Sequence, residues 1–183
     1  MVEILAVTPG VAAERAKWRY NGRVRPDFAE PVAKGAESVW DYPRPPRIEP
    51  VAKTLRVLAG ERLVAETHSG VRVCETAGAP AYYFPPEDVA SESVQPTGDR
   101  SVCEWKGVAE ELSLEGAAPA AWRYVEVFAQ YRQLYRWVAF YPYVFECYIG
   151  DERVTAQPGS YYGGWVTDAL AGPIKGLPGS ENW

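Results

Sequence analysis

One carboxylate, Glu75, lies where a predicted strand could place it beside an apolar layer. Residues 71–76 have the sequence Val-Arg-Val-Cys-Glu-Thr and are predicted to form a strand. Because side chains alternate across a strand, Val71, Val73 and Glu75 share one face. A carboxylate at the edge of such a face needs a cationic or hydrogen-bonding partner, or its pKa rises, and either environment is typical of functional sites. The alternative interpretation is a solvated Glu75 at the end of the strand.

A lysine in the segment 103–107, Lys106, is the second candidate. It lies between Trp105 and Gly107, so its ammonium could enter a cleft while the glycine lets a ligand approach the backbone. Glu75 and Lys106 could orient a polar ligand. They could instead act in catalysis, with the carboxylate as general acid or base and the lysine stabilising negative charge. The alternative is an ordinary strand end, with Trp105 in the core and Lys106 in solvent.

Aromatic residues gather in two segments, 82–86 and 159–165, which could line an apolar pocket with a polar rim. Seven Trp and twelve Tyr against five Phe mean that most rings carry a polar group. The side chains expected to contact a ligand are Arg72, Tyr82, Tyr83, Trp105, Tyr141 and Trp165. Individual rings could equally belong to the core.

Metal and cofactor chemistry finds little support in the residues. His68 is the only histidine, which excludes a site with several histidine ligands. The three cysteines form no C-x-x-C pair, which argues against a thiolate zinc site and against a disulfide framework. The common phosphate-binding loops and the G-x-S-x-G elbow are absent from the sequence. We therefore expect no metal and no cofactor, with Cys103 or Cys147 as a nucleophile only as a distant alternative.

The elements that must position these residues are mainly strands. Gly and Pro number 16 each in 183 residues, and aromatic residues make up 13%, a composition that favours β structure. Turn signals predict hairpins that join 55–58 to 63–67, turn at Gly116 after 111–115, and join 143–149 to 152–155. Only Trp122–Val138 has the apolar spacing of a helix. These patterns predict a mainly β, antiparallel two-sheet domain with one short helix.

We divide the chain into an N-terminal arm, residues 1–34, and a single β domain, residues 35–183. The arm contains a possible short helix at 11–17, and an Asn-Gly pair at 21–22 predicts a hairpin. The proline-rich stretch 41–46 is predicted to run extended into the first strand of the domain. It could dock a partner as a polyproline segment or cover the edge of a sheet.

Charge and hydropathy limit the partners. Residues 1–56 carry ten basic and seven acidic side chains, and residues 57–183 carry nine and seventeen. Because the larger part is acidic, we expect no nucleic-acid partner. No apolar run reaches the roughly 18 residues of a membrane span, and the N-terminus lacks the pattern of a signal peptide, which predicts a cytoplasmic protein without a membrane partner. The exposed aromatic surface is also compatible with a homodimer.

Six segments carry a resemblance to a known family. They are Glu37–Pro46, Val73–Thr76, Tyr82–Val89, Cys103–Gly107, Ala139–Pro142 and Gly163–Val166. In this order they resemble domain-of-unknown-function family 427, from about residue 37 to the end of the chain. The stretch 125–136 departs from the pattern because it lacks the prolines expected after Tyr124.

The resemblance implies an architecture more than an activity. The family resembles the β-tent group, in which two antiparallel sheets lean together at one edge. Several proteins of that group bind a small molecule or peptide at the open end, and many hold zinc through paired C-x-x-C motifs that this chain lacks. The family is sometimes labelled nucleotidyltransferase-like, but the Gly-Ser and spaced aspartates of that class are not found here. A shared fold is only an analogy for function.

Taken together, the residues and the resemblance predict a protein that binds a small polar or aromatic ligand in an aromatic-lined pocket. Glu75 and Lys106 would be the charged pair of that pocket. An enzyme that uses the same pair and a protein-interaction module are the alternatives.

Overall fold

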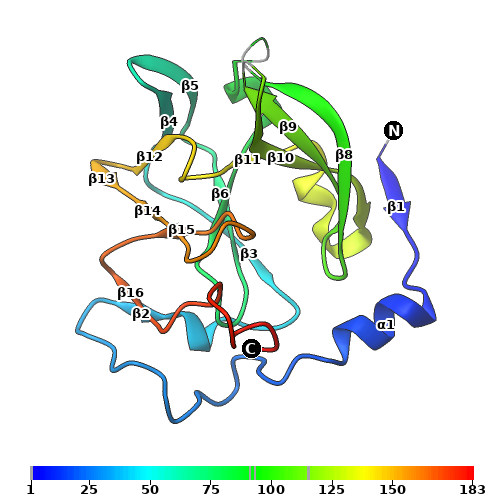
Figure 1. Cartoon of the computed structure of the whole chain (residues 1–183), viewed down its shortest axis with the longest axis vertical. Coiled ribbons are helices and arrows are strands. Elements are labelled where there is room, and N and C mark those ends of the chain that lie inside the picture. Colours follow the sequence, from blue (N-terminus) through cyan, green and yellow to red (C-terminus); the bar gives the residue numbers. More distant parts are fainter. Residues whose placement is uncertain (1, 91, 93, 115) are drawn as a thin grey trace.

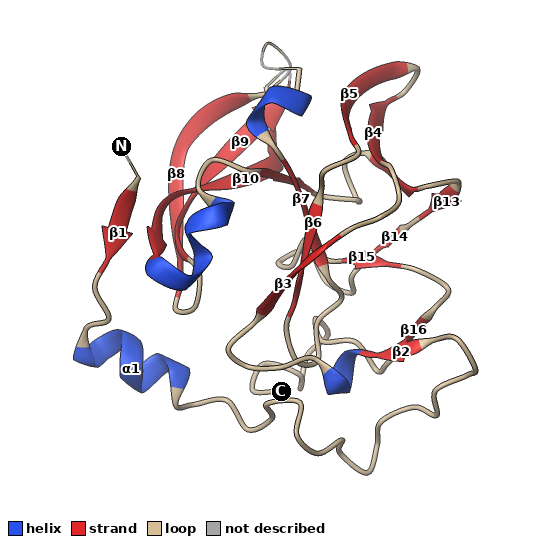
Figure 2. Cartoon of the chain, turned by 180° about the vertical axis from the view of Figure 1, so that it is seen from behind, coloured by secondary structure: helices blue, strands red, loops and turns tan. Residues whose placement is uncertain are grey.

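Two antiparallel sheets dominate the computed structural model, which describes residues 2–90, 92, 94–114 and 116–183 (Figure 1). The larger sheet has eight strands, and its long strands curl into a ribbon on one side of the molecule (Figure 2). In spatial order its strands are β3 (Arg47–Pro50), β6 (Val71–Cys74), β7 (Ala81–Phe84), β11 (Val138–Phe140), β10 (Ala117–Phe128), β9 (Gly107–Leu114) and β8 (Gln95–Cys103), and β1 (Glu3–Leu5) joins β10 in parallel.

The smaller sheet and two short strand pairs complete the β structure. The four strands of the smaller sheet are, in order, β13 (Glu152–Arg153), β12 (Glu146–Ile149), β4 (Leu55–Ala59) and β5 (Arg62–Thr67). The short pairs are β14 (Thr155–Ala156) with β15 (Trp165–Val166), and β16 (Leu170–Ala171) with β2 (Glu37–Ser38). The predicted mainly β, antiparallel class is confirmed, and the sheets form no closed barrel within the described residues.

Helical segments are short. They are α1 (Pro9–Arg15) and the 3-10 turns η1 (Val39–Asp41), η2 (Pro86–Asp88) and η3 (Ala129–Leu134). The hydroxyl of Thr8 caps α1 by accepting a hydrogen bond from the Val11 amide, 3.3 Å away. The short helix expected in the arm is therefore confirmed, with its start two residues earlier. Among the described residues, no helix has the length and apolarity needed to cross a membrane.

The larger sheet has an apolar layer on each face. The layer between the sheets includes Leu55 of β4 and Phe84 of β7. The layer on the opposite face includes Val73 of β6 and Tyr83 of β7. Because side chains alternate along β7, Tyr82 joins Phe84 between the sheets while Tyr83 faces the other way.

The predicted hairpins are present. Strands β4 and β5 pair as expected around the turn at Gly60, and β9 and β10 pair around Gly116. Strands β12 and β13 pair around Gly150, which has a φ of +62°. A left-handed backbone at that turn explains why glycine stands there.

The helix expected over Trp122–Val138 is wrong. Residues up to Phe128 extend β10, and only Ala129–Leu134 form a 3-10 turn. The segment Trp122–Phe128 is rich in aromatic and β-branched residues that favour a strand, and β9 pairs along most of it. The residues that gave the helical spacing belong to three different elements: Val127 lies in β10, Tyr131 and Leu134 lie in η3, and Val138 begins β11.

The hairpin expected at 21–22 is also wrong, because residues 18–25 form no strand. Gly22 does have a positive φ of +80°, but for another reason. A Cβ atom there would lie 2.2 Å from the carbonyl oxygen of Tyr42. The glycine therefore permits close contact between the arm and the proline-rich stretch.

The proline-rich stretch 41–46 packs against the body of the molecule. Tyr42 is 3% exposed, and the Thr76 hydroxyl after β6 donates to its carbonyl oxygen. The stretch leads extended into β3, as predicted. Tyr42 and Pro46 are buried and Pro45 is exposed, so the stretch lies along the body, which agrees with the prediction that it covers an edge.

Gly107 fixes the start of β9 against β10 and therefore the position of the preceding Lys106. Its φ is +134°, and a Cβ atom would lie 2.1 Å from the Glu126 carbonyl oxygen. The Phe128 amide also donates to the Lys106 carbonyl oxygen over 3.1 Å. Only glycine fits this approach without moving backbone.

Replacing Gly107 with Ala should lower the free energy of unfolding by about 3 kcal/mol or more, because backbone strain and a backbone clash act together. The control is Gly98→Ala in β8, where φ is +93° but no atom lies within 4 Å of the added Cβ. It should cost only about 1 kcal/mol from its backbone conformation. Denaturant unfolding followed by circular dichroism measures the stability of both variants. Equal losses of stability would show that the close approach of backbone at Gly107 adds nothing to the cost of the substitution.

Candidate functional site

A pocket of about 460 Å³ opens on the face of the larger sheet that lies away from the smaller sheet. Strands β6 to β10 and Tyr141 after β11 supply one wall, and the loop 157–164 supplies another. Trp18 from the arm and Lys175 from the C-terminal segment complete the lining. The pocket therefore combines residues from segments that are far apart in the sequence.

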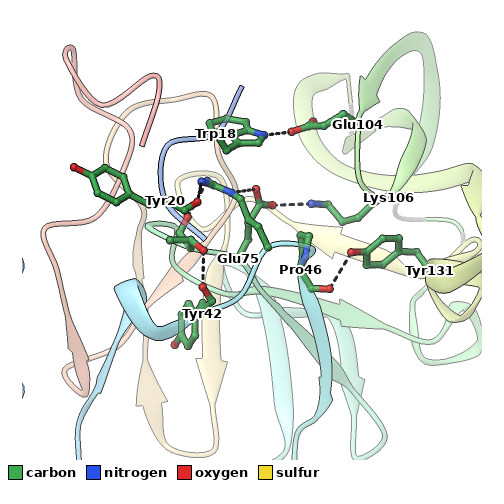
Figure 3. A network of polar contacts seen from close by, with 10 residues as sticks. Trp18, Tyr20, Tyr42, Pro46, Glu75, Glu104, Lys106 and Tyr131 are labelled. Carbon is green, nitrogen blue, oxygen red and sulfur yellow. Dashed lines mark hydrogen bonds and ion pairs between the residues drawn. The ribbon is translucent and has the colours of Figure 1, made fainter. Parts of the chain in front are cut away.

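The base of the pocket holds Glu75 between two cations. Its carboxylate accepts a hydrogen bond from Arg44 Nε at 3.1 Å and one from Lys106 Nζ at 3.2 Å (Figure 3). Arg44 also donates to the carbonyl oxygens of Tyr20 and Thr76, at 2.8 and 3.0 Å. The Arg44 side chain is 3% exposed. Three separate segments of chain therefore meet at one carboxylate.

These ion pairs determine the charge states of Glu75 and Lys106 at the bottom of the pocket. Burial alone would raise the pKa of Glu75, but the charges of Lys106 and Arg44 outweigh it, and the net result is a lowered pKa. Burial would lower the pKa of Lys106, but Cys103 and Glu75 raise it well above its ordinary value. Both groups therefore stay charged near neutral pH.

Four aromatic side chains form the wall of the pocket away from the base. The ring centroids of Trp122 and Tyr141 are 4.6 Å apart, and the Trp122 indole N–H donates to the Tyr83 hydroxyl over 3.2 Å. Tyr124 lies next to Tyr83, with ring centroids 6.3 Å apart. Gly163 closes against this group, since a Cβ there would lie 2.3 Å from the Trp122 ring.

The arm contributes Trp18 to the opposite side. Its indole N–H donates to Glu104 Oε1 over 2.6 Å (Figure 3). Arg15 Nε of α1 donates to the Glu104 carbonyl oxygen over 2.7 Å. The guanidinium of Arg44 lies 4.1 Å from the centroid of the Trp18 ring, and the ammonium of Lys175 lies 3.8 Å from it. Both contacts are close enough for cation–π attraction.

Lys175 is the least expected residue of the pocket. It is 3% exposed, and its backbone is fixed on both sides. Its amide donates to the Ala77 carbonyl oxygen over 2.8 Å, and Gln157 Nε2 donates to its carbonyl oxygen over 2.8 Å. Within the described residues, its ammonium contacts the rings of Trp18 and Tyr162 and forms no ion pair with a carboxylate.

The pKa of the Lys175 amine is lowered to about 8. Burial is the main cause, and the neighbouring guanidinium of Arg44 adds to it, while Glu75 and Glu104 oppose the shift. Lys106 and Lys175 line the same pocket, but their pKa values move in opposite directions, because interactions with Cys103 and Glu75 outweigh burial at Lys106, whereas burial dominates at Lys175.

A comparison with protein families matches residues 47–150 to the family described as Domain of unknown function (DUF427). The chain belongs to this family. The matched range of the DUF427 domain contains Glu75, Lys106 and the aromatic wall, but it excludes Trp18, Arg44 and Lys175. A comparison with curated proteins finds no match.

The pocket of this DUF427 member contains four of the predicted site residues. Glu75 and Lys106 are brought together as an ion pair, and Tyr83 and Tyr141 line the aromatic wall. The alternation along residues 71–76 placed Glu75 on the same face as Val73, and both line the pocket.

Four other predicted residues lie away from the pocket. Arg72 points to the other face of β6, where Nε donates to Glu49 over 2.9 Å and Nη2 to Glu37 over 3.1 Å. The remaining three are rings packed in the interior, namely Tyr82 and Trp165, stacked 5.0 Å apart between the sheets, and Trp105, which packs under Arg15. Their aromatic character did not reveal which face of the sheet they occupy.

Sequence reasoning missed Trp18, Arg44, Trp122, Tyr124 and Lys175. Alternation in a strand would have placed Trp122 and Tyr124 together, but the segment was assigned to a helix. Arg44 lies within a proline-rich stretch that predicted only an extended backbone. No local pattern marks Trp18 or Lys175, because each reaches the pocket through tertiary packing of a terminal segment.

Replacing Glu75 with Gln should lower the free energy of unfolding by about 3 kcal/mol at neutral pH, because two buried cations lose their counter-charge. Urea unfolding measures the loss. Glu61→Gln, in the exposed turn between β4 and β5, is the matched control and should change stability little. An unfolding free energy equal to that of the wild type would show that the Glu75 carboxylate does not stabilise the bottom of the pocket.

The same variant should change the acid dependence of stability. Because the pKa of Glu75 is lowered in the folded protein, its contribution is complete above the unfolded-state pKa of about 4.3 and is lost as the pH falls through the folded-state value. The unfolding free energies of the wild type and Glu75→Gln should therefore converge in acid.

Proposed function

We propose that this protein binds a small planar ligand that carries a hydrogen-bond-accepting or anionic group, and that Lys175 contacts this group. One observation carries the proposal: a buried ammonium faces the pocket and has no carboxylate ion pair among the described residues. A buried charge without a counter-charge is unfavourable. An anionic or hydrogen-bond-accepting group of a ligand would supply the partner that the Lys175 ammonium lacks among the described residues.

The pocket's size and lining support the same proposal. Its volume of about 460 Å³ falls within the range of roughly 300–1,000 Å³ that small-molecule pockets occupy. Trp122 and Tyr141 offer ring faces for a planar molecule, and Trp18 and Tyr162 flank the ammonium of Lys175. Aromatic rings in the walls, together with a cation that forms no carboxylate ion pair within the described residues, fit a ligand that has a flat apolar body and one polar end.

The ion-paired group of Arg44, Glu75 and Lys106 at the bottom of the pocket would shape the cavity and orient the ligand. Glu75 has both oxygens engaged by Arg44 and Lys106, and its lowered pKa keeps it ionised. These features argue against Glu75 as a general acid or base, whose pKa should lie near the working pH. The burial of Cys147, which raises the pKa of its thiol, likewise argues against a nucleophilic role for that residue.

Several finer expectations stay proposals. We infer that residues 35–183 form one domain and that residues 1–34 are an arm, now with the added role of supplying Trp18 to the pocket. The β-tent architecture, a cytoplasmic location, the absence of a nucleic-acid partner and a homodimer stay predictions from the sequence and the resemblance.

Indole-3-carboxylate tests the proposal, because it has a planar body and one carboxylate. Isothermal titration calorimetry should show saturable binding to the wild type, and Lys175→Met should weaken it by about tenfold or more through loss of a charge-assisted hydrogen bond. Lys53→Met removes an exposed lysine and should leave the affinity unchanged. Cyclohexanecarboxylate, which carries the same charge on a non-planar ring, should bind more weakly than indole-3-carboxylate.

Two results would contradict the proposal. One is the absence of binding to the wild type at millimolar concentrations of indole-3-carboxylate and of benzoate, a second planar carboxylate. The other is equal affinity in the wild type and Lys175→Met, with melting temperatures showing that both are folded.

A further inference from the structure

The two buried lysines of the pocket have opposite surroundings. Lys106 donates to Glu75, whereas the Lys175 amine lies against aromatic rings. The other three lysines of the sequence, Lys17, Lys34 and Lys53, are exposed. Lys175 is therefore the one lysine of the chain that combines burial, a ligand-sized cavity and the lack of a carboxylate ion pair within the described residues.

Burial and the guanidinium of Arg44 favour the neutral form of Lys175, and nearby carboxylates oppose them. Arg44 lies against the same indole ring of Trp18 and disfavours a second positive charge there. The three carboxylates that act on Lys175 through charge have other partners. Glu75 is paired with Arg44 and Lys106, Glu104 accepts from the Trp18 indole, and Glu181 accepts from the Gly179 amide.

An unprotonated amine is a nucleophile, and desolvation beside another cation is a known way to obtain one in a protein. The lowered pKa of about 8 agrees with this geometry, since a substantial minority of the Lys175 side chains is neutral at slightly alkaline pH. The fixed backbone of Lys175 holds the amine in place, because its N–H and its carbonyl oxygen are both hydrogen-bonded.

We propose that Lys175 is a nucleophilic amine that forms an imine with a planar aldehyde or ketone bound in this pocket. The inference rests on the proposed function, because the carbonyl compound must occupy the same cavity as the planar ligand. It narrows the ligand class: the acceptor group that faces Lys175 is a carbonyl.

The reaction balances without any oxidant or reductant. The lone pair of Nζ attacks the carbonyl carbon, and the electrons of the carbonyl π bond move to oxygen. A proton passes from nitrogen to oxygen to give a carbinolamine, which loses water to form the C=N bond. One amine and one carbonyl compound give one imine and one water molecule.

Borohydride trapping of the full chain tests the inference. The wild type is incubated with indole-3-carboxaldehyde and sodium cyanoborohydride at slightly alkaline pH, and peptide mapping by mass spectrometry locates the alkylated lysines. Lys175 should react about tenfold faster than Lys53, because its environment favours the neutral amine. Lys106 should stay unmodified because it is paired with Glu75.

Two controls connect reactivity to the pocket. Added indole-3-carboxylate, which binds but cannot form an imine, should protect Lys175 and leave Lys53 unprotected. Lys175→Arg keeps a cation at this position and should lose the rapid labelling, while its melting temperature shows that it folds.

The outcomes separate this inference from the proposed function. If indole-3-carboxylate binds but the aldehyde labels Lys175 no faster than Lys53, the imine is wrong and the binding proposal stands. If Lys175 is labelled rapidly without protection by indole-3-carboxylate, the reactive amine does not belong to the ligand site and the inference also fails. If the carboxylate does not bind and Lys175 is not labelled, both are wrong.

Discussion

The structure around the pocket depends on one half-buried carboxylate. Glu75 follows β6, Arg44 precedes β3, and Lys106 lies in the turn between β8 and β9, so a single anion joins three parts of the larger sheet. Removing any one member would leave a buried charge without its partner. Arg44 extends the network to the arm through the Tyr20 carbonyl oxygen. The carboxylate therefore holds the elements between which the cavity opens.

The pocket shows how one environment can tune two identical side chains in opposite ways. Interactions with Cys103 and Glu75 outweigh the effect of burial on Lys106, and its pKa rises well above the ordinary value. Burial also lowers the pKa of Lys175, and this lysine faces rings and a guanidinium, so its proton is held less tightly. Lys106 is thus ion-paired with Glu75, whereas Lys175 has no carboxylate ion pair among the described residues.

Local patterns predicted the parts of this arrangement that depend on local geometry. Alternation along 71–76 placed Glu75 beside Val73, and turn residues at Gly60, Gly116 and Gly150 predicted three hairpins. Alternation could not tell which face of β7 is the pocket, so Tyr82 and Tyr83 were treated alike although only Tyr83 lines the cavity. The long pairing between β9 and β10 overrode an apparent helical spacing after Trp122. Trp18 and Lys175 reach the site only through tertiary packing of the terminal segments.

The division of the pocket between the family region and its flanks determines which substitutions can change the pocket's lining. Residues 47–150 carry the sheet and the Glu75–Lys106 pair, whereas Trp18, Arg44 and Lys175 come from the segments on either side. The flanks are not independent of the sheet, because β1 pairs with β10 and Arg44 donates to Glu75. A substitution at Trp18 or Lys175 would change the lining of the pocket while leaving every residue of the family region as it is.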